Sequence, residues 1–261
     1  MSGQDILISI EGHVGILTVN RPKVHNALSD DVLRQFEAAF IDLENNDQVR
    51  VIVITGAGDR SFVAGGDLAE MEKRAGLAHY QEFGEDVHRV FRRIEVSDKP
   101  TIAAVNGYAL GGGTELLLCT DIRLAADSAQ FALPEIGLGV FPGAGGTQRA
   151  IRQLSPCQAR EIMFTGDWFS AQRALELGLI NHVVSPDSLM SETMAIAERI
   201  ATKSPLVMKL LKRTLRDGVD MPMGAALAHE QAMIGLVFDT ENGNEGIQAF
   251  LEKRKASFTG R

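Results

Sequence analysis

The sequence predicts an α/β fold in which strands and helices alternate around a largely parallel sheet, followed by helices alone. Short apolar, β-branched runs alternate with segments of three- and four-residue apolar spacing until about residue 184. From residue 187 onward the pattern is helical, with turn signals such as Ser204-Pro205 between the helices. Hydrophobic residues make up 45% of the 261 positions and charged residues 23%. These are globular values, so the composition excludes disordered, collagen-like and coiled-coil chains.

The first 55 residues predict a β-hairpin, a helix and a buried strand. Alternating runs on both sides of Gly12 are typical of a hairpin. Ser29 or Asp30 can cap a helix with apolar positions three and four residues apart. A continuous apolar run then suits a strand buried on both faces of a parallel sheet. The segments are 6–10 and 14–19 for the hairpin, about 30–43 for the helix, and 51–55 for the strand.

Two further units of the same kind follow. A helix of about 78–94 leads to the apolar run 102–105, and a short helix after the glycines at 111–113 leads to a strand at 122–126. This repetition predicts right-handed βαβ units. A further extended run is expected at 131–133, and helices at 187–202, 205–217, 222–237 and 244–255.

The helix predicted at 205–217 has an apolar face and a basic face. The basic face consists of Lys209, Lys212, Arg213 and Arg216. A solvated surface is the first interpretation of such a face, and a phosphate- or partner-binding surface is the alternative.

Charge and cysteine content narrow the functional classes. The formal net charge of −8 disfavours nucleic acid as the main ligand, because the protein's field repels phosphate backbones. Cys119 and Cys157 match neither disulfide nor zinc spacing, so we expect no metal site and a reducing compartment. No apolar run approaches membrane-spanning length, and residues 1–5 lack the pattern of a signal peptide. We therefore expect no membrane partner and a cytoplasmic protein.

Glycines gather in four clusters after predicted strands or loops. In parallel α/β folds such loops form the ligand crevice, where glycine lets backbone N–H groups approach a ligand. Tight turns alone are the alternative for any single cluster. No complete dinucleotide, P-loop, serine-hydrolase or zincin motif is present. The clusters are 56–58, 65–66, 107–113 and 143–146.

Two carboxylates lie beside these clusters. Glu115 is two residues beyond the triple glycine, and Glu135 follows Pro134 at the end of a predicted strand. Glu115 could simply interact with a helix dipole, and Glu135 could be an ordinary loop acid. A pair of acids beside backbone donors suits proton transfer next to a polarised carbonyl.

Six segments, in order along the chain, resemble the crotonase superfamily, the enoyl-CoA hydratase/isomerase family. Their common order over nearly the whole chain is more specific than any single motif. The segments are 20–28 (NRPKVHNAL), 61–68 (SFVAGGDL), 104–115 (AVNGYALGGGTE), 134–139 (PEIGLG), 142–148 (PGAGGTQ) and 250–254 (FLEKR).

The resemblance implies a ββα spiral core over residues 1–186 and a C-terminal helical trimerisation region over 187–261. It implies homotrimers, often stacked into hexamers, that bind acyl-CoA thioesters. No separate cofactor is implied, because coenzyme A is part of the substrate.

The resemblance also implies residue roles. The N–H groups of Gly66 and Gly112 would form an oxyanion hole, while Glu115 would activate water for attack on Cβ and protonated Glu135 would deliver a proton to Cα. The sequence departs from many hydratases at Gly66, where alanine is common, and at Thr114, where cysteine is frequent. Residues implied to bind CoA are Lys23, Val24, His25, Ala64, Asp67 and Leu68, with Phe250 and Lys253 approaching the adenine or phosphate from a neighbouring subunit.

Hydration of a 2-enoyl-CoA is the function that the resemblance implies. The nearest alternative within the family is isomerisation of an enoyl-CoA, or hydration of a branched or aromatic acyl-CoA. Other classes are a non-catalytic acyl-CoA sensor, which the glutamate pair disfavours, and an RNA binder, which the net charge disfavours. Residues 69–80, Val140, Phe141 and the helix at 228–238 are expected to line the acyl pocket.

Overall fold

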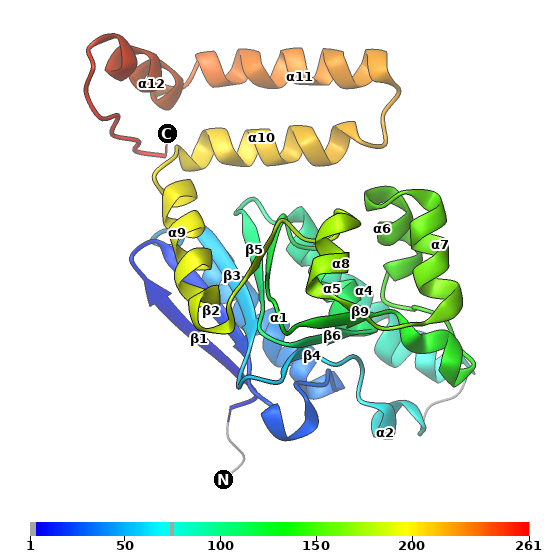
Figure 1. The fold of residues 1–261 in the computed structure, drawn as a ribbon. Coiled ribbons are helices and arrows are strands. Elements are labelled where there is room, and N and C mark those ends of the chain that lie inside the picture. Colours follow the sequence, from blue (N-terminus) through cyan, green and yellow to red (C-terminus); the bar gives the residue numbers. More distant parts are fainter. Residues whose placement is uncertain (1–3, 74–75, 261) are drawn as a thin grey trace.

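The computed structural model describes residues 4–73 and 76–260, and it contains two β-sheets that pack around a shared core (Figure 1). Residues 1–3 and positions 74 and 75 of the expected acyl-pocket segment lie outside this description. The larger sheet has the order β1-β2-β3-β5-β7-β10, and the smaller one β4-β6-β8-β9. The pairs β1–β2 and β8–β9 are antiparallel, and the others are parallel. The strands are β1 (Ile6–Glu11), β2 (Val14–Val19), β3 (Val51–Gly56), β4 (Ser61–Val63), β5 (Thr101–Val105), β6 (Tyr108–Leu110), β7 (Ile122–Ala126), β8 (Gln130–Ala132), β9 (Phe169–Ser170) and β10 (His182–Val184).

Consecutive strands alternate between the two sheets before each helical segment. The chain passes from β3 to β4, from β5 to β6 and from β7 to β8, so each turn adds one strand to each sheet. This confirms the ββα spiral that the resemblance implies. It revises the simple βαβ units expected from hydrophobic patterning, because the crossovers contain β4 and β6. These strands have three residues each, which is too short to show an alternating pattern.

The helices confirm most predicted segments. Ser29 caps α1 by accepting a hydrogen bond from the Val32 amide. The helix expected at 78–94 contains a π-helical turn, η2, before α4. Helices α6, α7 and α8 were not predicted. The last helix begins at Glu241 instead of 244 because Thr240 caps it. The bounds are α1 (Asp30–Asn45), α2 (Leu68–Met71), α3 (Gly76–Ala78), α4 (Glu85–Val96), α5 (Gly112–Leu117), α6 (Gly146–Gln153), α7 (Pro156–Thr165), α8 (Ala171–Glu176), α9 (Leu189–Ala201), α10 (Pro205–Gly218), α11 (Met223–Phe238), α12 (Glu241–Leu251), η1 (Pro22–Val24), η2 (His79–Gly84), η3 (Pro134–Leu138) and η4 (Pro186–Ser188).

Apolar side chains form a core on each face of the larger sheet. One cluster joins this sheet to the smaller sheet and to α1 and α4 through residues such as Phe36, Ile54 and Phe91. The other cluster packs α9 against the opposite face. Helix α9 therefore lies on the sheet, while α10, α11 and α12 extend beyond it (Figure 1).

The division of the chain at residue 186 stays a prediction. Within residues 4–73 and 76–260, no helix has the length and apolar character needed to cross a bilayer.

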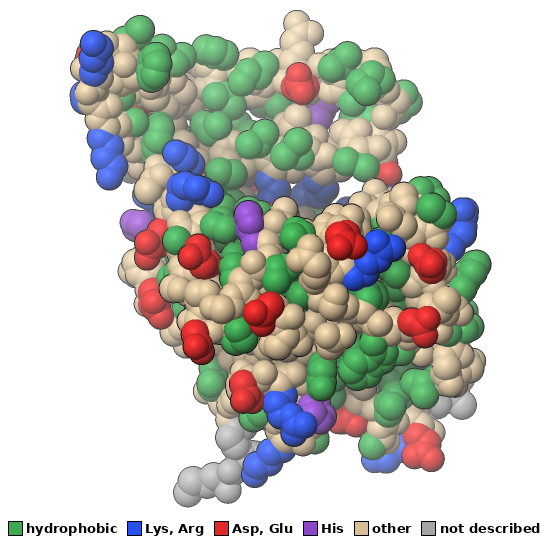
Figure 2. Space-filling model, viewed as in Figure 1, with side chains coloured by type: hydrophobic (Ala, Val, Ile, Leu, Met, Phe, Trp, Pro, Cys, Tyr) green, Lys and Arg blue, Asp and Glu red, His purple; other side chains and the backbone are tan. Residues whose placement is uncertain are grey.

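The basic face of α10 is only in part the solvated surface of its first interpretation, because Lys212 is buried whereas Arg213 is exposed. Lys212 is buried and bonds to Asp121 at 2.6 Å, and Arg213 bonds to Asp98 at 2.7 Å. These contacts attach α10 to the core, and Figure 2 shows Lys and Arg side chains in the hollow beneath this helix. Part of the apolar face is open as well, since Leu211 and Leu215 are 49% and 63% exposed.

Candidate active site

The candidate site lies where three parallel strands of the smaller sheet end. Strand β4 leads to Gly65 and Gly66, β6 leads to Gly111 and Gly112, and β8 leads to Glu135. Because β4, β6 and β8 are parallel, their carboxyl ends meet at one edge of the sheet. Ligands of open α/β sheets bind at such an edge.

Two backbone amides are brought together at this edge. An added Cβ on Gly112 would lie 3.6 Å from the Gly66 nitrogen, so the two glycines are in close contact. Gly112 opens α5, and its N–H therefore has no acceptor within the helix. The parallel bridge between Leu28 and Gly66 uses the Gly65 carbonyl and the Asp67 amide, which leaves the Gly66 N–H outside the bridge. These two N–H groups can bind a developing oxyanion.

Glu115 occupies the first turn of α5 and is buried, with 2% exposure. Its Oε1 accepts hydrogen bonds from the amides of Ala144 at 2.8 Å and Gly146 at 2.7 Å. Residue 146 must be small, because a Cβ there would lie 2.9 Å from Oε1. Since Gly146 is also the first residue of α6, the carboxylate lies at the positive end of that helix.

Burial raises the pKa of the Glu115 carboxyl to about 7. The neighbouring Glu135 carboxyl adds to this rise, whereas the two amides and the Arg149 guanidinium oppose it. Glu115 is therefore a group that can hold or release a proton near neutral pH.

Glu135 reaches the site from η3, directly after Pro134. Its Oε1 lies close to Gly111, where an added Cβ would come within 2.9 Å. Its Oε2 is buried and has no hydrogen-bond partner among the described residues. Burial raises the pKa of this carboxyl as well. An oxygen without a donor or cation favours the protonated form, so the surroundings of Glu135 suit an acid.

The residues implied to bind CoA divide into two groups. His25 Nδ1 lies 3.1 Å from Ser61 Oγ, and the Ala64 amide bonds to the His25 carbonyl, so η1 lies beside β4. Asp67 precedes α2 but its side chain makes no capping hydrogen bond, and it pairs with Arg21 at 3.4 Å. The structure thus brings together one group, which comprises Lys23, Val24, His25, Ala64, Asp67 and Leu68.

Phe250 and Lys253 are not part of that group within one chain. Phe250 lies in α12 and Lys253 follows it, at the opposite end of the molecule from α2 (Figure 1). Phe250 is 82% exposed. Helix α11, expected at the acyl pocket, packs on α10 and is also remote from the smaller sheet. Val140 and Phe141 follow η3 closely and are exposed.

Three contributors were not singled out from the sequence. The amides of Ala144 and Gly146 hold Glu115, and Arg149 lies against the turn that carries them. The glycine cluster at 143–146 was the available signal, because consecutive amides in glycine-rich turns bind anions. Among the described residues, no group of three or more His, Cys, Asp or Glu could hold a metal ion.

Comparisons with known proteins show the family to which the chain is similar. Residues 9–261 match the family model described as enoyl-CoA hydratase/isomerase. A crotonyl-CoA hydratase of Syntrophomonas wolfei is 43% identical over 99% of both chains. A short-chain-enoyl-CoA hydratase of Clostridium acetobutylicum is 42% identical over 98% of this chain and 97% of its own. The crystal structure of an enoyl-CoA hydratase from Bacillus anthracis has a TM-score of 0.95 and 36% identity, covering 99% of this chain and 100% of that one.

Proposed function

The chain belongs to the enoyl-CoA hydratase/isomerase family and is a hydro-lyase, and from this premise we propose that Glu115 and Glu135 perform its reaction. That reaction is the reversible syn addition of water across the 2,3 double bond of a 2-enoyl-CoA. The observation that carries the proposal is the pair of carboxyls, Glu115 buried and Glu135 half-buried, beside the amides of Gly66 and Gly112.

The two carboxyls divide the proton transfers. Glu115 is held by two N–H donors and acts as the base that takes a proton from water as its oxygen bonds to Cβ. Glu135, with an unpartnered oxygen, acts as the acid that donates a proton to Cα. After hydration Glu115 is protonated and Glu135 is ionised. Loss of one proton from Glu115 and uptake of one proton by Glu135 restore the starting state.

The oxyanion hole lowers the barrier for attack on Cβ. Negative charge develops on the thioester oxygen, and the N–H groups of Gly66 and Gly112 stabilise it. Each such donor is typically worth about 2.7–4 kcal/mol in the transition state. No separate cofactor takes part, because coenzyme A is part of the substrate.

The substrate we propose has a short acyl chain. Its support is the similarity to one relative named for crotonyl-CoA and another named for short-chain enoyl-CoA. Val24, His25 and Ala64 would contact CoA beside β4, together with Lys23, Asp67 and Leu68.

The complete site requires more than one copy of the chain in this proposal. Phe250 and Lys253 would reach CoA from a neighbouring subunit of a homotrimer or hexamer. Hydrophobic side chains on the extended helices support this assembly (Figure 2). Leu227, Ile234 and Phe238 of α11 are each about half exposed or more. Light scattering measures the oligomeric state and so tests the assembly. If Lys253 contacts CoA, Lys253→Ala should have an increased KM for the acyl-CoA substrate. The cytoplasmic location stays a prediction.

Loss of the conjugated-thioester absorbance of crotonyl-CoA tests the reaction. The wild type should remove it rapidly, whereas Glu115→Ala and Glu135→Ala should not. Glu192→Ala, an exposed glutamate on α9, serves as the control and should retain wild-type activity. Calorimetric binding of butyryl-CoA, which has no double bond to hydrate, shows whether inactive variants still bind. A wild type that binds butyryl-CoA but leaves crotonyl-CoA unchanged contradicts the proposed reaction, as does full activity of either alanine variant.

A further inference from the structure

Arg149 connects the turn that holds Glu115 to a charged pair outside the site. It lies on α6, and its side chain is 12% exposed. Its Nη1 donates to the Ala144 carbonyl at 3.1 Å, and its Nη2 donates to Glu95 at 3.1 Å. The guanidinium therefore bridges α4 and the turn whose amides bind Glu115.

The turn is shaped to accept this guanidinium. Gly145 has a φ of +105°, which disfavours other residues, and a Cβ there would overlap Arg149 Nη1. Arg149 thus lies against one side of the turn, while Glu115 accepts the Ala144 and Gly146 amides on the other. Movement of Arg149 would displace both donors.

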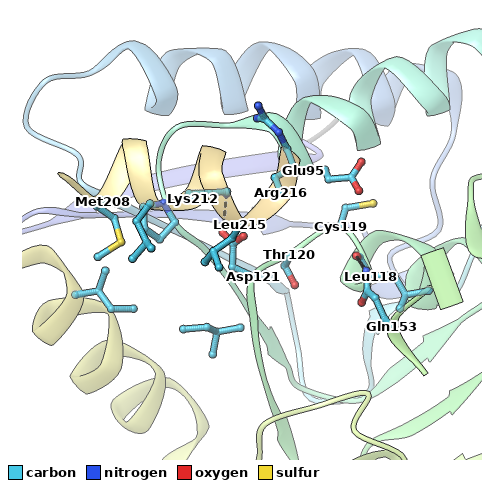
Figure 3. A pocket seen from close by; sticks show the side chains of 14 residues that line it. Glu95, Leu118, Cys119, Thr120, Asp121, Gln153, Met208, Lys212, Leu215 and Arg216 are labelled. Atoms are coloured by element: carbon cyan, nitrogen blue, oxygen red, sulfur yellow. Dashed lines mark hydrogen bonds and ion pairs between the residues drawn. The ribbon is translucent and has the colours of Figure 1, made fainter. Parts of the chain in front are cut away.

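Glu95 anchors the outer end of the bridge. It accepts hydrogen bonds from Arg92 at 2.8 Å as well as from Arg149. Burial opposes ionisation of Glu95, but these two guanidinium groups outweigh it and lower its pKa. Figure 3 shows Glu95 on the wall of the cavity of about 490 Å³ beneath α10. Its side-chain partners are Arg92 and Arg149, so replacing Glu95 alters the bridge from outside the site.

We propose that Arg149 is a positioning residue, which holds the 144–146 turn against Glu115 and supplies a positive charge that favours the ionised base. This inference rests on the proposed function for its consequence in catalysis. The titratable groups around Glu115 are Glu135 from η3, Arg149 from α6 and Cys119 after α5. Burial raises the pKa of the Cys119 thiol to about 12, so this group stays neutral. Arg149 is the cation of this set.

The proposal predicts pKa shifts of opposite sign at Glu115. Arg149→Gln removes the cation and should raise the pKa of Glu115 by about one unit. Glu95→Gln leaves the cation without its counter-charge and should lower this pKa. Arg149→Lys keeps the positive charge but lacks the two-armed guanidinium. The pKa of Glu115 in this variant should therefore be close to the wild-type value, whereas the bridge that holds the turn should be incomplete. Arg152→Gln is the control, because Arg152 lies on the same helix and bonds to Gln148 and Asp220 instead.

Carbon-13 NMR of glutamate-labelled protein measures these titrations directly, with the Glu115 signal assigned from Glu115→Gln. Opposite shifts in the two variants, with no shift in the control, support the proposal. An unchanged Glu115 titration in Arg149→Gln overturns it. Shifts of the same sign in Arg149→Gln and Glu95→Gln overturn the role of the positive charge, because they indicate that loss of the bridge disorders the turn in both variants.

Activity provides the second readout. The ratio of kcat/KM at pH 9 to that at pH 6 should be about 3–10-fold larger in Arg149→Gln than in the wild type. If the NMR titration shifts as expected but this ratio does not change, the positioning role stands and Glu115 is not the base. The two measurements thus distinguish failure of the positioning role of Arg149 from failure of the proposed role of Glu115.

Discussion

The Thr114 hydroxyl lies 2.9 Å from the Ala132 carbonyl oxygen and 2.6 Å from that of Ala109. Thr114 directly precedes Glu115 in α5, and Ala132 ends the strand that leads to Glu135. One buried side chain therefore ties the helix carrying the first carboxyl to the strand leading to the second. This gives a structural reason for threonine at a position where many hydratases have cysteine.

Thr114→Val should destabilise the protein by about 1–3 kcal/mol, because it removes a buried hydroxyl while keeping the side-chain shape. Thr114→Ser retains the hydroxyl and is the matched control. Urea unfolding followed by circular dichroism measures both variants. Equal midpoints and slopes for Thr114→Val and the wild type would contradict the anchoring role.

Gly112→Ala should reduce hydration of crotonyl-CoA by about 10²–10³-fold with little loss of stability. The added methyl makes ordinary contacts of 3.6 Å, but one of them is with the Gly66 nitrogen, the other proposed donor. Gly66→Ala should have a smaller effect, because its methyl meets the flexible Met71 side chain at 3.0 Å. Steady-state kinetics and thermal unfolding of both variants check this. A fully active Gly112→Ala enzyme would exclude the proposed oxyanion hole.

Long periodic segments were predictable from sequence, whereas short elements and distant contacts were not. Helix α1 and strand β3 carry many apolar residues at a clear period, so their patterns identify them. Strands β4 and β6 are too short to show a period, yet they determine that Gly66 and Gly112 meet. Three of the four glycine clusters, 65–66, 107–113 and 143–146, lie in loops that meet at the candidate site. The pairing of those loops depends on the order of the smaller sheet, which pattern alone does not show.

The contacts of individual polar residues were the least predictable. Glu115 receives its hydrogen bonds from a turn about thirty residues later in the chain, and only the tertiary fold brings the two together. The pattern of α10 does not show that Lys212 and Arg213 pair with Asp121 and Asp98, because these carboxylates lie about ninety residues or more earlier. Helical periodicity defines a face but not what covers it.

The hydration rate should fall below a pH of about 7. Glu115 must be ionised to accept a proton from water, and burial raises its pKa to about 7. At lower pH, kcat/KM should decrease about tenfold per pH unit. Stopped-flow measurements with crotonyl-CoA between pH 5 and pH 8 determine this limb. A rate that is constant down to pH 5 would show that the base titrates near the ordinary value for glutamate. Because Glu135 is close, the observed midpoint belongs to the pair.

Glu115→Gln should become increasingly more stable than the wild type as the pH rises from about 4.5 to 7. The pKa of Glu115 is raised in the folded state, so between these values the folded wild type binds more protons than the unfolded chain. The contribution of Glu115 to the stability of the wild type is therefore fully present below the pKa that this group has in the unfolded chain. It is lost as the pH rises through the pKa of the group in the folded state. Glutamine has no such titration, and its amide oxygen can still accept the Ala144 and Gly146 hydrogen bonds.

The difference in unfolding free energy between Glu115→Gln and the wild type should reach about 3 kcal/mol above pH 7. Urea unfolding of both proteins at several pH values between 5 and 8 measures it. Glu192→Gln, at an exposed site on α9, should show no such trend. A pH-independent difference for Glu115→Gln would mean that the carboxyl is already ionised throughout this range. In that case burial does not impede its ionisation, and the amides of Ala144 and Gly146 together with Arg149 fully offset the loss of water.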